Sequence, residues 1–189
     1  MIDPKAVHAT LAKHQLADGF PFVMDLERSQ GSWIYDSRAN RRYLDFFTCF
    51  ASWPIGYNHP GTLEESFRRE IELAGRNNPA NSDLYTTQMA DFVEAFATQV
   101  TPAEYPYHFW VAGGALAVEN ALKVAFDWKA HKVGVDQVHD GNDLVILHFK
   151  AAFHGRSGYT MSLTNTVKDK VALFPKFDWP RVHNPGIVF

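Results

Sequence analysis

A short apolar run passes directly into two glycines in His108-Phe109-Trp110-Val111-Ala112-Gly113-Gly114. Such a run is typical of a β-strand, and the glycines are typical of a tight turn that leads into a helix. The next segment carries apolar residues along one side, at Val118, Leu122, Ala125 and Phe126. After a polar loop (132–142), Leu144-Val145-Ile146-Leu147-His148-Phe149 predicts a strand that is buried on both faces. Strand, helix and strand in this order predict a βαβ unit with a parallel sheet, and therefore an α/β fold.

The residues before this unit change period twice. Asp3 and Pro4 are typical of a helix cap and a first helical position, and they predict a short helix that runs to about Leu16. Three β-rich runs follow (22–24, 32–35 and 43–47), and the segments between them carry turn residues. This pattern predicts a small antiparallel meander.

Two further helices are expected between the meander and the βαβ unit. Thr62 and Glu65 stand at the spacing of a capping box, and they predict a helix with apolar residues every four positions, at Leu63, Phe67 and Ile71. After a loop (76–82), Asn81-Ser82-Asp83 is typical of a helix cap. A core-facing stripe then follows the helical period at Met89, Phe92, Val93 and Phe96.

The composition narrows the class of protein. Of the 189 residues, 46% are hydrophobic and 21% charged, as in ordinary globular proteins, so disorder and fibrous structures are excluded. The net charge of −3 comes without any basic cluster, so nucleic acid is not expected as a partner. The single Cys49 excludes an internal disulfide, and the scattered histidines indicate no metal site. No apolar run is long enough to cross a membrane and no signal-peptide pattern is seen, so we expect a cytoplasmic location.

Gly113-Gly114-Ala115 is the first candidate for chemistry, because it lies at the predicted start of a helix. Unpaired backbone N–H groups and the helix dipole favour an anion there, and small residues allow a phosphate to come close. An ordinary tight turn that uses glycine only for its backbone freedom remains the alternative.

Phe153-His154-Gly155-Arg156 is the second candidate, just beyond the predicted strand that ends at Lys150. Ligands of open α/β sheets bind at the carboxyl ends of the strands. An aromatic ring there can lie against a planar ligand, and Arg156 can bind a carboxylate through two hydrogen bonds. A turn with a packed Phe153 and a solvated Arg156 is the alternative. Both candidates lie on the same edge of the predicted sheet, which favours a planar, phosphorylated cofactor together with an acidic substrate.

Five other polar residues are expected to be structural rather than chemical. Asp36 and Asp45 lie in or beside turns of the meander, and Cys49 has no base near it in sequence, so a small buried side chain is the better interpretation. His108 and His148 lie inside apolar strands, where we expect their ring nitrogens to be satisfied by hydrogen bonds.

These motifs resemble the class III aminotransferases, which depend on pyridoxal 5'-phosphate and have fold type I. Similar segments are Gly31–Asp36, Arg42–Phe46, Gly56–Pro60, Asn78–Asp83, Gly113–Lys123, Phe153–Thr166 and Phe174–Pro180. The resemblance covers nearly the whole chain. It implies an N-terminal segment of helix, β-meander and helix (1–75), followed by the first part of the cofactor-binding α/β domain (76–189), which is incomplete.

The resemblance also implies roles for particular residues. Gly114 and Ala115 would bind the cofactor phosphate through their backbone. Phe153 would stack on the pyridine ring, and His154 beside it belongs to the same cofactor site. Arg156 would hold the α-carboxylate of the amino donor. The likeness is strongest to the branch that moves the ε-amino group of L-lysine to 2-oxoglutarate, which gives the 6-semialdehyde and glutamate.

Two further implications concern assembly and catalysis. Members of the family form their sites at a homodimer interface, so the loops around Asn58 and Asn81 would face the partner subunit. Most members carry Ser-Gly-Ser/Thr-Glu-Ala where this chain has Gly113–Ala117, and the lysine branch shares the variant. None of the nine lysines matches the Schiff-base lysine of the family, so the chain contains no catalytic residue and is expected to be inactive alone. The alternatives are a relative that acts on ornithine, acetylornithine or 4-aminobutyrate, or a non-catalytic remnant or binding fragment.

Overall fold

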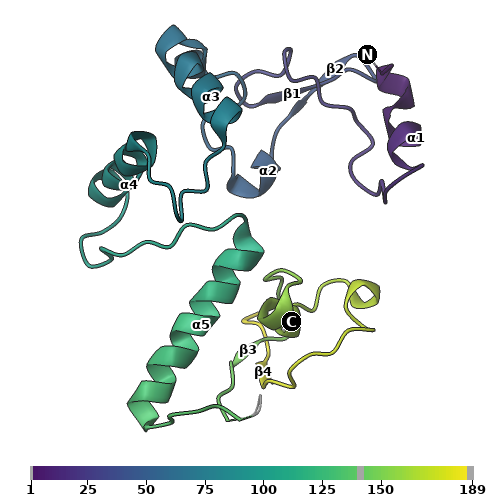
Figure 1. The fold of residues 1–189 in the computed structure, drawn as a ribbon. Helices are drawn as coiled ribbons and strands as arrows, with labels where there is room; N and C mark the ends of the chain where they lie inside the picture. Colours follow the sequence, from purple (N-terminus) through teal and green to yellow (C-terminus); the bar gives the residue numbers. More distant parts are fainter. Residues whose placement is uncertain (1, 140–142, 187–189) are drawn as a thin grey trace. The chain divides into compact units, whose positions relative to one another are not determined.

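The structure, a computed structural model, describes residues 2–139 and 143–186. It contains two compact units, Met1–Glu94 and Ala95–Phe189, and each combines helices with a short two-stranded sheet (Figure 1). The α/β class is confirmed. Helix α4 (Thr87–Gln99) begins in the first unit and ends in the second. The domain limits implied by the family resemblance, 1–75 and 76–189, stay a prediction.

The first unit opens with the predicted cap. The Asp3 carboxylate accepts a hydrogen bond from the Lys5 N–H at 2.8 Å, at the start of η1 (Pro4–Ala6). Helix α1 (Val7–Leu11) follows and ends five residues before the predicted Leu16. Leu16 is 74% exposed, so no buried contact extends the helix. Short helices depend on such packing, because their own hydrogen bonds do not stabilise them in water.

The predicted meander is reduced to a hairpin with one additional bridge. Strand β1 (Trp33–Asp36) pairs antiparallel with β2 (Arg41–Leu44), with Trp33 opposite Leu44. The first of the three expected runs, 22–24, contributes only a single bridge, between Met24 and Asp36. The buried Asp36 side chain accounts for this geometry, since its Oδ1 accepts from the N–H groups of Val23 and Arg38 at 2.9 Å each. Asp36 is therefore structural, as expected.

Both predicted capping motifs are wrong. Thr62 lies in η2 (Pro60–Leu63), where its hydroxyl donates to the His59 carbonyl at 2.7 Å, and α3 (Glu65–Asn77) begins after it. The hydroxyl is already used inside η2, so no capping box forms. Helix α4 is capped by Thr86 instead of Asn81-Ser82-Asp83, because the Thr86 Oγ1 accepts from the Met89 N–H at 3.2 Å.

The apolar stripe of α4 is only partly covered. Met89, Val93 and Phe96 are half-buried, and Phe92 is 49% exposed.

Helix α2 (Thr48–Ala51) of the first unit has an unusual backbone, since all four of its residues have positive φ. Its neighbour Asp45 accepts from the N–H groups of Phe47 and Thr48 and from the Tyr57 hydroxyl. Asp45 is thus a turn residue, as predicted.

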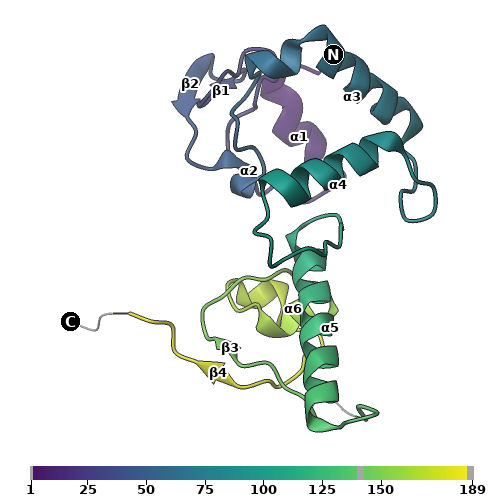
Figure 2. The same ribbon diagram turned by 90° about the vertical axis from the view of Figure 1, so that its left-hand side faces the viewer.

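Helix α5 (Gly114–Val133) forms the long axis of the second unit (Figure 2). Strand β3 (His148–Phe149) pairs in parallel with β4 (Arg181–Val182), and α6 (Gly158–Leu163) and η3 (Lys168–Lys170) lie on the connection between them. The described residues therefore contain a parallel crossover, but it connects β3 to β4. The predicted crossover was α5, between the runs 108–112 and 144–149. The core of this unit is made by Leu122, Leu163 and Trp179 with Val118, Phe126, Ile146 and Tyr159 packed against them.

The two strands expected on either side of α5 differ from prediction. Residues 108–112 have no regular secondary structure; instead, the rings of His108 and Trp110 stack and both meet the edge of Phe96. A strand needs a hydrogen-bonded neighbour, and no described segment pairs with 108–112. In 144–149 only two residues pair, and burial alternates: Leu144 is buried, whereas Leu147 is 65% exposed. The prediction of burial on both faces is therefore wrong.

The remaining sequence predictions for this unit hold where they can be followed. Helix α5 ends at Gly134, which has φ of 71°, and the loop begins there, although residues 140–142 of the predicted loop lie outside the described residues. The ring nitrogens of His148 meet the Ile146 carbonyl at 3.2 Å and the Arg181 Nε at 3.0 Å, so this buried histidine is satisfied.

We predict that the Asp36 carboxylate contributes to the free energy of unfolding above about pH 4, and that this contribution is lost as the pH falls below that value. Burial alone would raise the pKa of Asp36, but N–H donors from Val23, Arg38 and Ala39, with the charge of Arg41, lower it. A lowered pKa in the folded state means that the unfolded state binds more protons as the pH falls, so stability is lost through that window. D36N should lower the free energy of unfolding at pH 7 by about 1–3 kcal/mol and flatten its acid limb.

Urea unfolding followed from pH 7 to pH 3 measures both effects. The exposed Asp91 provides a matched control, since D91N removes a carboxylate of the same unit that has no buried hydrogen bonds. Equal losses of stability in D36N and D91N would contradict the assigned role.

Candidate functional site

The first turn of α5 is the place where the sequence predicts an anion-binding turn, and its backbone geometry is compatible with that prediction. Gly113 precedes the helix with φ of 86° and ψ of 156°, a conformation that favours glycine. The first N–H groups of a helix have no carbonyl of that helix to pair with, and the first turn of α5 contains no acidic side chain. Gly114 and Ala115 therefore present backbone donors at the positive end of a long helix.

Gly155 brings the second candidate motif against this turn. It has φ of +113°, and a Cβ on it would lie 2.4 Å from the Cβ of Ala115. Such a distance is far below van der Waals contact, so only glycine fits. The structure thus brings the predicted anion turn and the Phe153–Arg156 segment together, and it does so through backbone contact.

Phe153 and Arg156 lie on the exposed side of this junction. The Arg156 guanidinium carbon lies 5.0 Å from the centre of the Phe153 ring, and the Phe153 side chain is 55% exposed. No carboxylate pairs with Arg156 within the described ranges, 2–139 and 143–186. The guanidinium thus lies over one face of the Phe153 ring, and both side chains are exposed beside the turn.

His154 holds the segment in place through its backbone. Its N–H donates to Thr164 Oγ1 at 3.0 Å, and the Thr164 hydroxyl in turn donates to the Gly155 carbonyl at 2.6 Å. Thr164 is fully buried. A single threonine after α6 therefore fixes the backbone of both His154 and Gly155, and the His154 ring is half-buried.

Glu119 is the member of this site that the sequence interpretation missed. Its carboxylate accepts from the Ser157 hydroxyl at 2.8 Å and from the N–H groups of Tyr159 and Thr160 at 3.0 and 3.2 Å. Burial alone would raise the pKa of Glu119, but these donors, with Lys123 nearby, lower it. The signal was present: Ala115, Glu119, Leu122 and Phe126 share one helical face, and Glu119 is a charge on an otherwise apolar stripe.

The sequence candidates set aside as structural do not join this site. Cys49 lies 3.7 Å from the Tyr57 hydroxyl, which donates to Asp45. Burial and the contacts with Asp45 and Cys49 raise the pKa of Tyr57. His108 Nε2 meets the Thr101 hydroxyl at 3.0 Å, so a hydrogen bond is present as predicted, but the residue is half-buried and lies outside any strand. Among the described residues, no group of three or more histidine, cysteine and carboxylate side chains could hold a metal ion.

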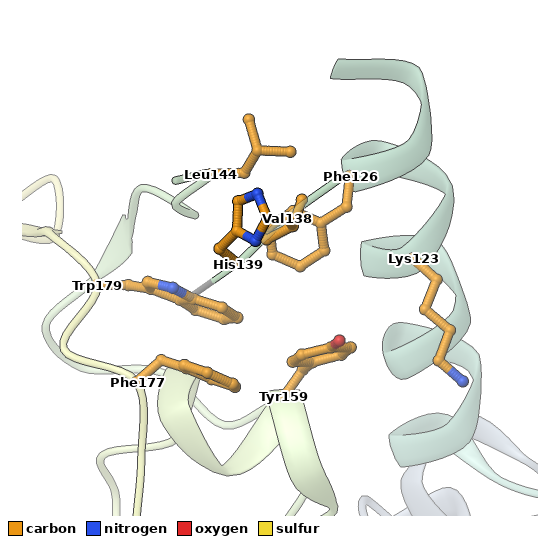
Figure 3. Close-up of a pocket in the computed structure, with 8 residues that line it drawn as sticks. All are labelled: Lys123, Phe126, Val138, His139, Leu144, Tyr159, Phe177 and Trp179. Carbon is orange, nitrogen blue, oxygen red and sulfur yellow. The ribbon is translucent and has the colours of Figure 1, made fainter. Parts of the chain in front are cut away.

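The second unit also contains an apolar cavity of about 320 Å³ that is separate from the candidate motifs (Figure 3). The rings of Phe177 and Trp179 stack on one side of it, with centres 4.9 Å apart. Its lining is Lys123, Phe126, Val138, His139, Leu144, Tyr159, Phe177 and Trp179. None of the five predicted site residues is among them, so the cavity and the anion turn are different features.

The part of the chain that the structure describes has no helix that is both long and apolar enough to cross a membrane.

Comparison with known proteins supplies the context for this geometry. L-lysine-epsilon aminotransferases from Streptomyces clavuligerus and Amycolatopsis lactamdurans are each 50% identical to the chain, over 96% and 98% of its length. The solved lysine aminotransferase from M. tuberculosis is 47% identical over 99% of the chain, with a TM-score of 0.87. The chain spans 40% and 41% of the two curated relatives and 43% of the solved structure. The family model for class-III aminotransferases matches residues 16–185, and the chain belongs to that family.

Proposed function

We propose that the full-length gene product is a pyridoxal-phosphate-dependent aminotransferase that moves the ε-amino group of L-lysine to 2-oxoglutarate. The observation that carries the proposal is the contact of Gly155 with Ala115, which joins an anion-binding turn to an aromatic ring and a guanidinium. The 50% identity to two relatives named L-lysine-epsilon aminotransferase supports lysine as the donor. The single cysteine supports a reducing compartment, the cytoplasm.

The residues present fit the phosphate and the ring of the cofactor. The backbone N–H groups of Gly114 and Ala115 would hold the phosphate, since the first turn has no acidic side chain and a Cβ on Gly114 would meet nothing within 4 Å. Phe153 would cover one face of the pyridine ring, and His154 would place that phenyl group through its anchored backbone. When bound, the cofactor supplies the carbonyl carbon and electron-withdrawing ring that carry the amino group between the two substrates.

Arg156 would select the donor. Its guanidinium can bind the α-carboxylate of lysine through two parallel hydrogen bonds, which turns the other end of the substrate toward the cofactor. A donor held by its α-carboxylate at Arg156 presents its distal amino group, and this orientation explains transfer from the ε-position. The lysine that the family uses to bind the cofactor is not matched by any lysine of this chain, so the proposal concerns the full-length protein.

Other donors are the alternatives. Ornithine also carries an α-carboxylate for Arg156, but it is one methylene shorter than lysine, whereas 4-aminobutyrate has its only carboxylate nearer to the amino group. Initial rates with lysine, ornithine, acetylornithine and 4-aminobutyrate decide among them. A preference for ornithine over lysine would overturn the choice of lysine, and no transfer from any donor would favour a non-catalytic protein.

We predict that R156A in the full-length protein weakens recognition of lysine. Loss of a charge-assisted hydrogen bond costs about 1.5–3 kcal/mol, which is roughly a ten- to hundred-fold loss in kcat/KM. Steady-state kinetics with lysine as the varied substrate measures the effect. The control is K129A, which removes an exposed positive charge from α5. An unchanged KM and kcat in R156A would remove Arg156 from the site.

We predict that F153A loses its cofactor faster than the parent, because one face of the pyridine ring is no longer covered. Dialysis followed by absorbance of the retained cofactor measures the rate of loss. Phe174 is a matched control, since its side chain is 53% exposed and belongs to the same unit. Cofactor retention in F153A equal to that in the parent and in F174A would count against stacking.

The full-length protein is expected to be a homodimer, with the loops around Asn58 and Asn81 facing the partner. The Asn58 side chain donates to the carbonyls of Leu26 and Ser29, so its loop is held in shape by its own chain. The exposed rings of Phe46 and Phe50, each 88% exposed, support a surface that is covered in the assembly. Sedimentation equilibrium should give twice the mass of one chain, and a monomer active at the same concentration would contradict the expectation.

A further inference from the structure

Glu119 connects two helices at the candidate site. It belongs to α5, one turn after Ala115, and its carboxylate reaches the first turn of α6. There Oε2 accepts from the Ser157 hydroxyl and the Thr160 N–H, and Oε1 accepts from the Tyr159 N–H. Three donors from one short stretch therefore converge on a single carboxylate of another helix.

This arrangement is a strong local constraint. The first N–H groups of a helix need acceptors beyond the regular helical bonds; the capping box of Ser157 and Thr160 supplies part of them, and the Glu119 carboxylate, a strong acceptor, supplies the rest. Thr160 is fully buried, so the acceptors for its N–H are the Glu119 carboxylate and the Ser157 hydroxyl, and not solvent. Loss of Glu119 leaves the Tyr159 N–H without this acceptor and the Ser157 hydroxyl with Thr160 alone, so the start of α6 is held less firmly.

The constraint acts on both sides of Arg156. Gly155, the residue before it, lies against Ala115, and Ser157, the residue after it, is bound to Glu119. Ala115 and Glu119 are both on α5, so the backbone of Arg156 is held between two points on one rigid helix. The Arg156 side chain itself lies over the Phe153 ring.

We propose that Glu119 is a positioning residue for Arg156: by fixing Ser157 and the start of α6, it sets the position from which the guanidinium binds the carboxylate of the amino donor. The inference rests on the proposed function, because it assumes a donor carboxylate at Arg156. Glu119 acts through the backbone of the loop and does not touch donor or cofactor. Its removal should therefore weaken binding of the donor much more than it slows the chemical step.

The experiment uses the full-length protein and the variants E119Q, S157A, R156A and E119Q/R156A. E119Q keeps the size of the side chain but replaces one acceptor oxygen by an amide that repels the N–H donors. S157A removes the shortest of the three hydrogen bonds to Glu119, together with the bond between the Ser157 and Thr160 hydroxyls, and leaves Glu119 in place. We expect the KM for lysine to rise about tenfold in E119Q and several-fold in S157A, with kcat changed less than twofold in both.

The double variant tests whether Glu119 acts through Arg156. When the guanidinium is already absent, its position no longer matters, so E119Q should raise the KM of R156A by less than twofold. If the increases in KM caused by E119Q and R156A multiply in the double variant, the two residues act independently and the proposal is overturned. A fall in kcat without a rise in KM in E119Q and S157A would also overturn it.

A second measurement does not depend on activity. Hydrogen exchange followed by mass spectrometry, on the cofactor-free protein, should show faster exchange in the peptide that contains residues 155–160 for E119Q and S157A. The control is E104Q, which changes an exposed glutamate of the same unit and should leave this peptide and the kinetics unchanged. Exchange in E119Q equal to that of the parent would refute the positioning role.

The two readouts separate this inference from the proposed function. A parent protein that does not transfer the amino group of lysine would refute the proposed function, and exchange alone would then decide whether Glu119 holds the loop. If E119Q does not fold, S157A carries both measurements, since it removes only one hydroxyl.

Discussion

The close approach of Gly155 to Ala115 is the contact on which the candidate site depends. A side chain at residue 155 would place its Cβ 2.4 Å from that of Ala115, and the positive φ of Gly155 disfavours any other residue. Because the contact is between backbone atoms and a methyl group, it leaves little room for adjustment. The segment that carries Phe153 and Arg156 is thereby fixed to the start of α5, and Thr164 and Glu119 secure the residues on either side.

The elements that sequence analysis predicted well are those that local sequence determines. Helix α5 begins at the second of its two glycines and ends at Val133, just before Gly134, and the strands β1 and β2 lie on either side of the predicted turn residues. The errors occurred where an element depends on a distant partner. Residues 108–112 have the composition of a strand, but a strand is defined by its neighbour, and the aromatic rings of His108 and Trp110 pack on Phe96 instead. The Thr62 hydroxyl was likewise committed to a turn that the spacing did not reveal.

The site was anticipated in part. The sequence pattern predicted two strands that end on one sheet edge, which would bring the glycine turn and Phe153–Arg156 near each other. The two segments do lie near each other, but for a different reason. A glycine contact and a buried carboxylate bring them together, and residues 108–112 provide no sheet edge. Glu119 was overlooked because α5 was interpreted from its apolar positions alone. A charge on the core-facing side of a helix requires donors from another element, and the Ser157 and Thr160 pair supplies them.

The alanine at position 115 takes part in the same contact. The resemblance to the family places a serine or threonine at this position in most members, where its hydroxyl would reach the phosphate. In this chain the Ala115 methyl group faces the backbone of Gly155. The backbone N–H groups in the first turn of α5 are then the remaining donors to an anion. Backbone donors have a fixed direction and require the helix start to be held rigidly. The Gly155 contact and the Glu119 hydrogen bonds provide that rigidity on the two sides of the turn. A site without the hydroxyl therefore depends more strongly on the backbone geometry around α5 than one that has it.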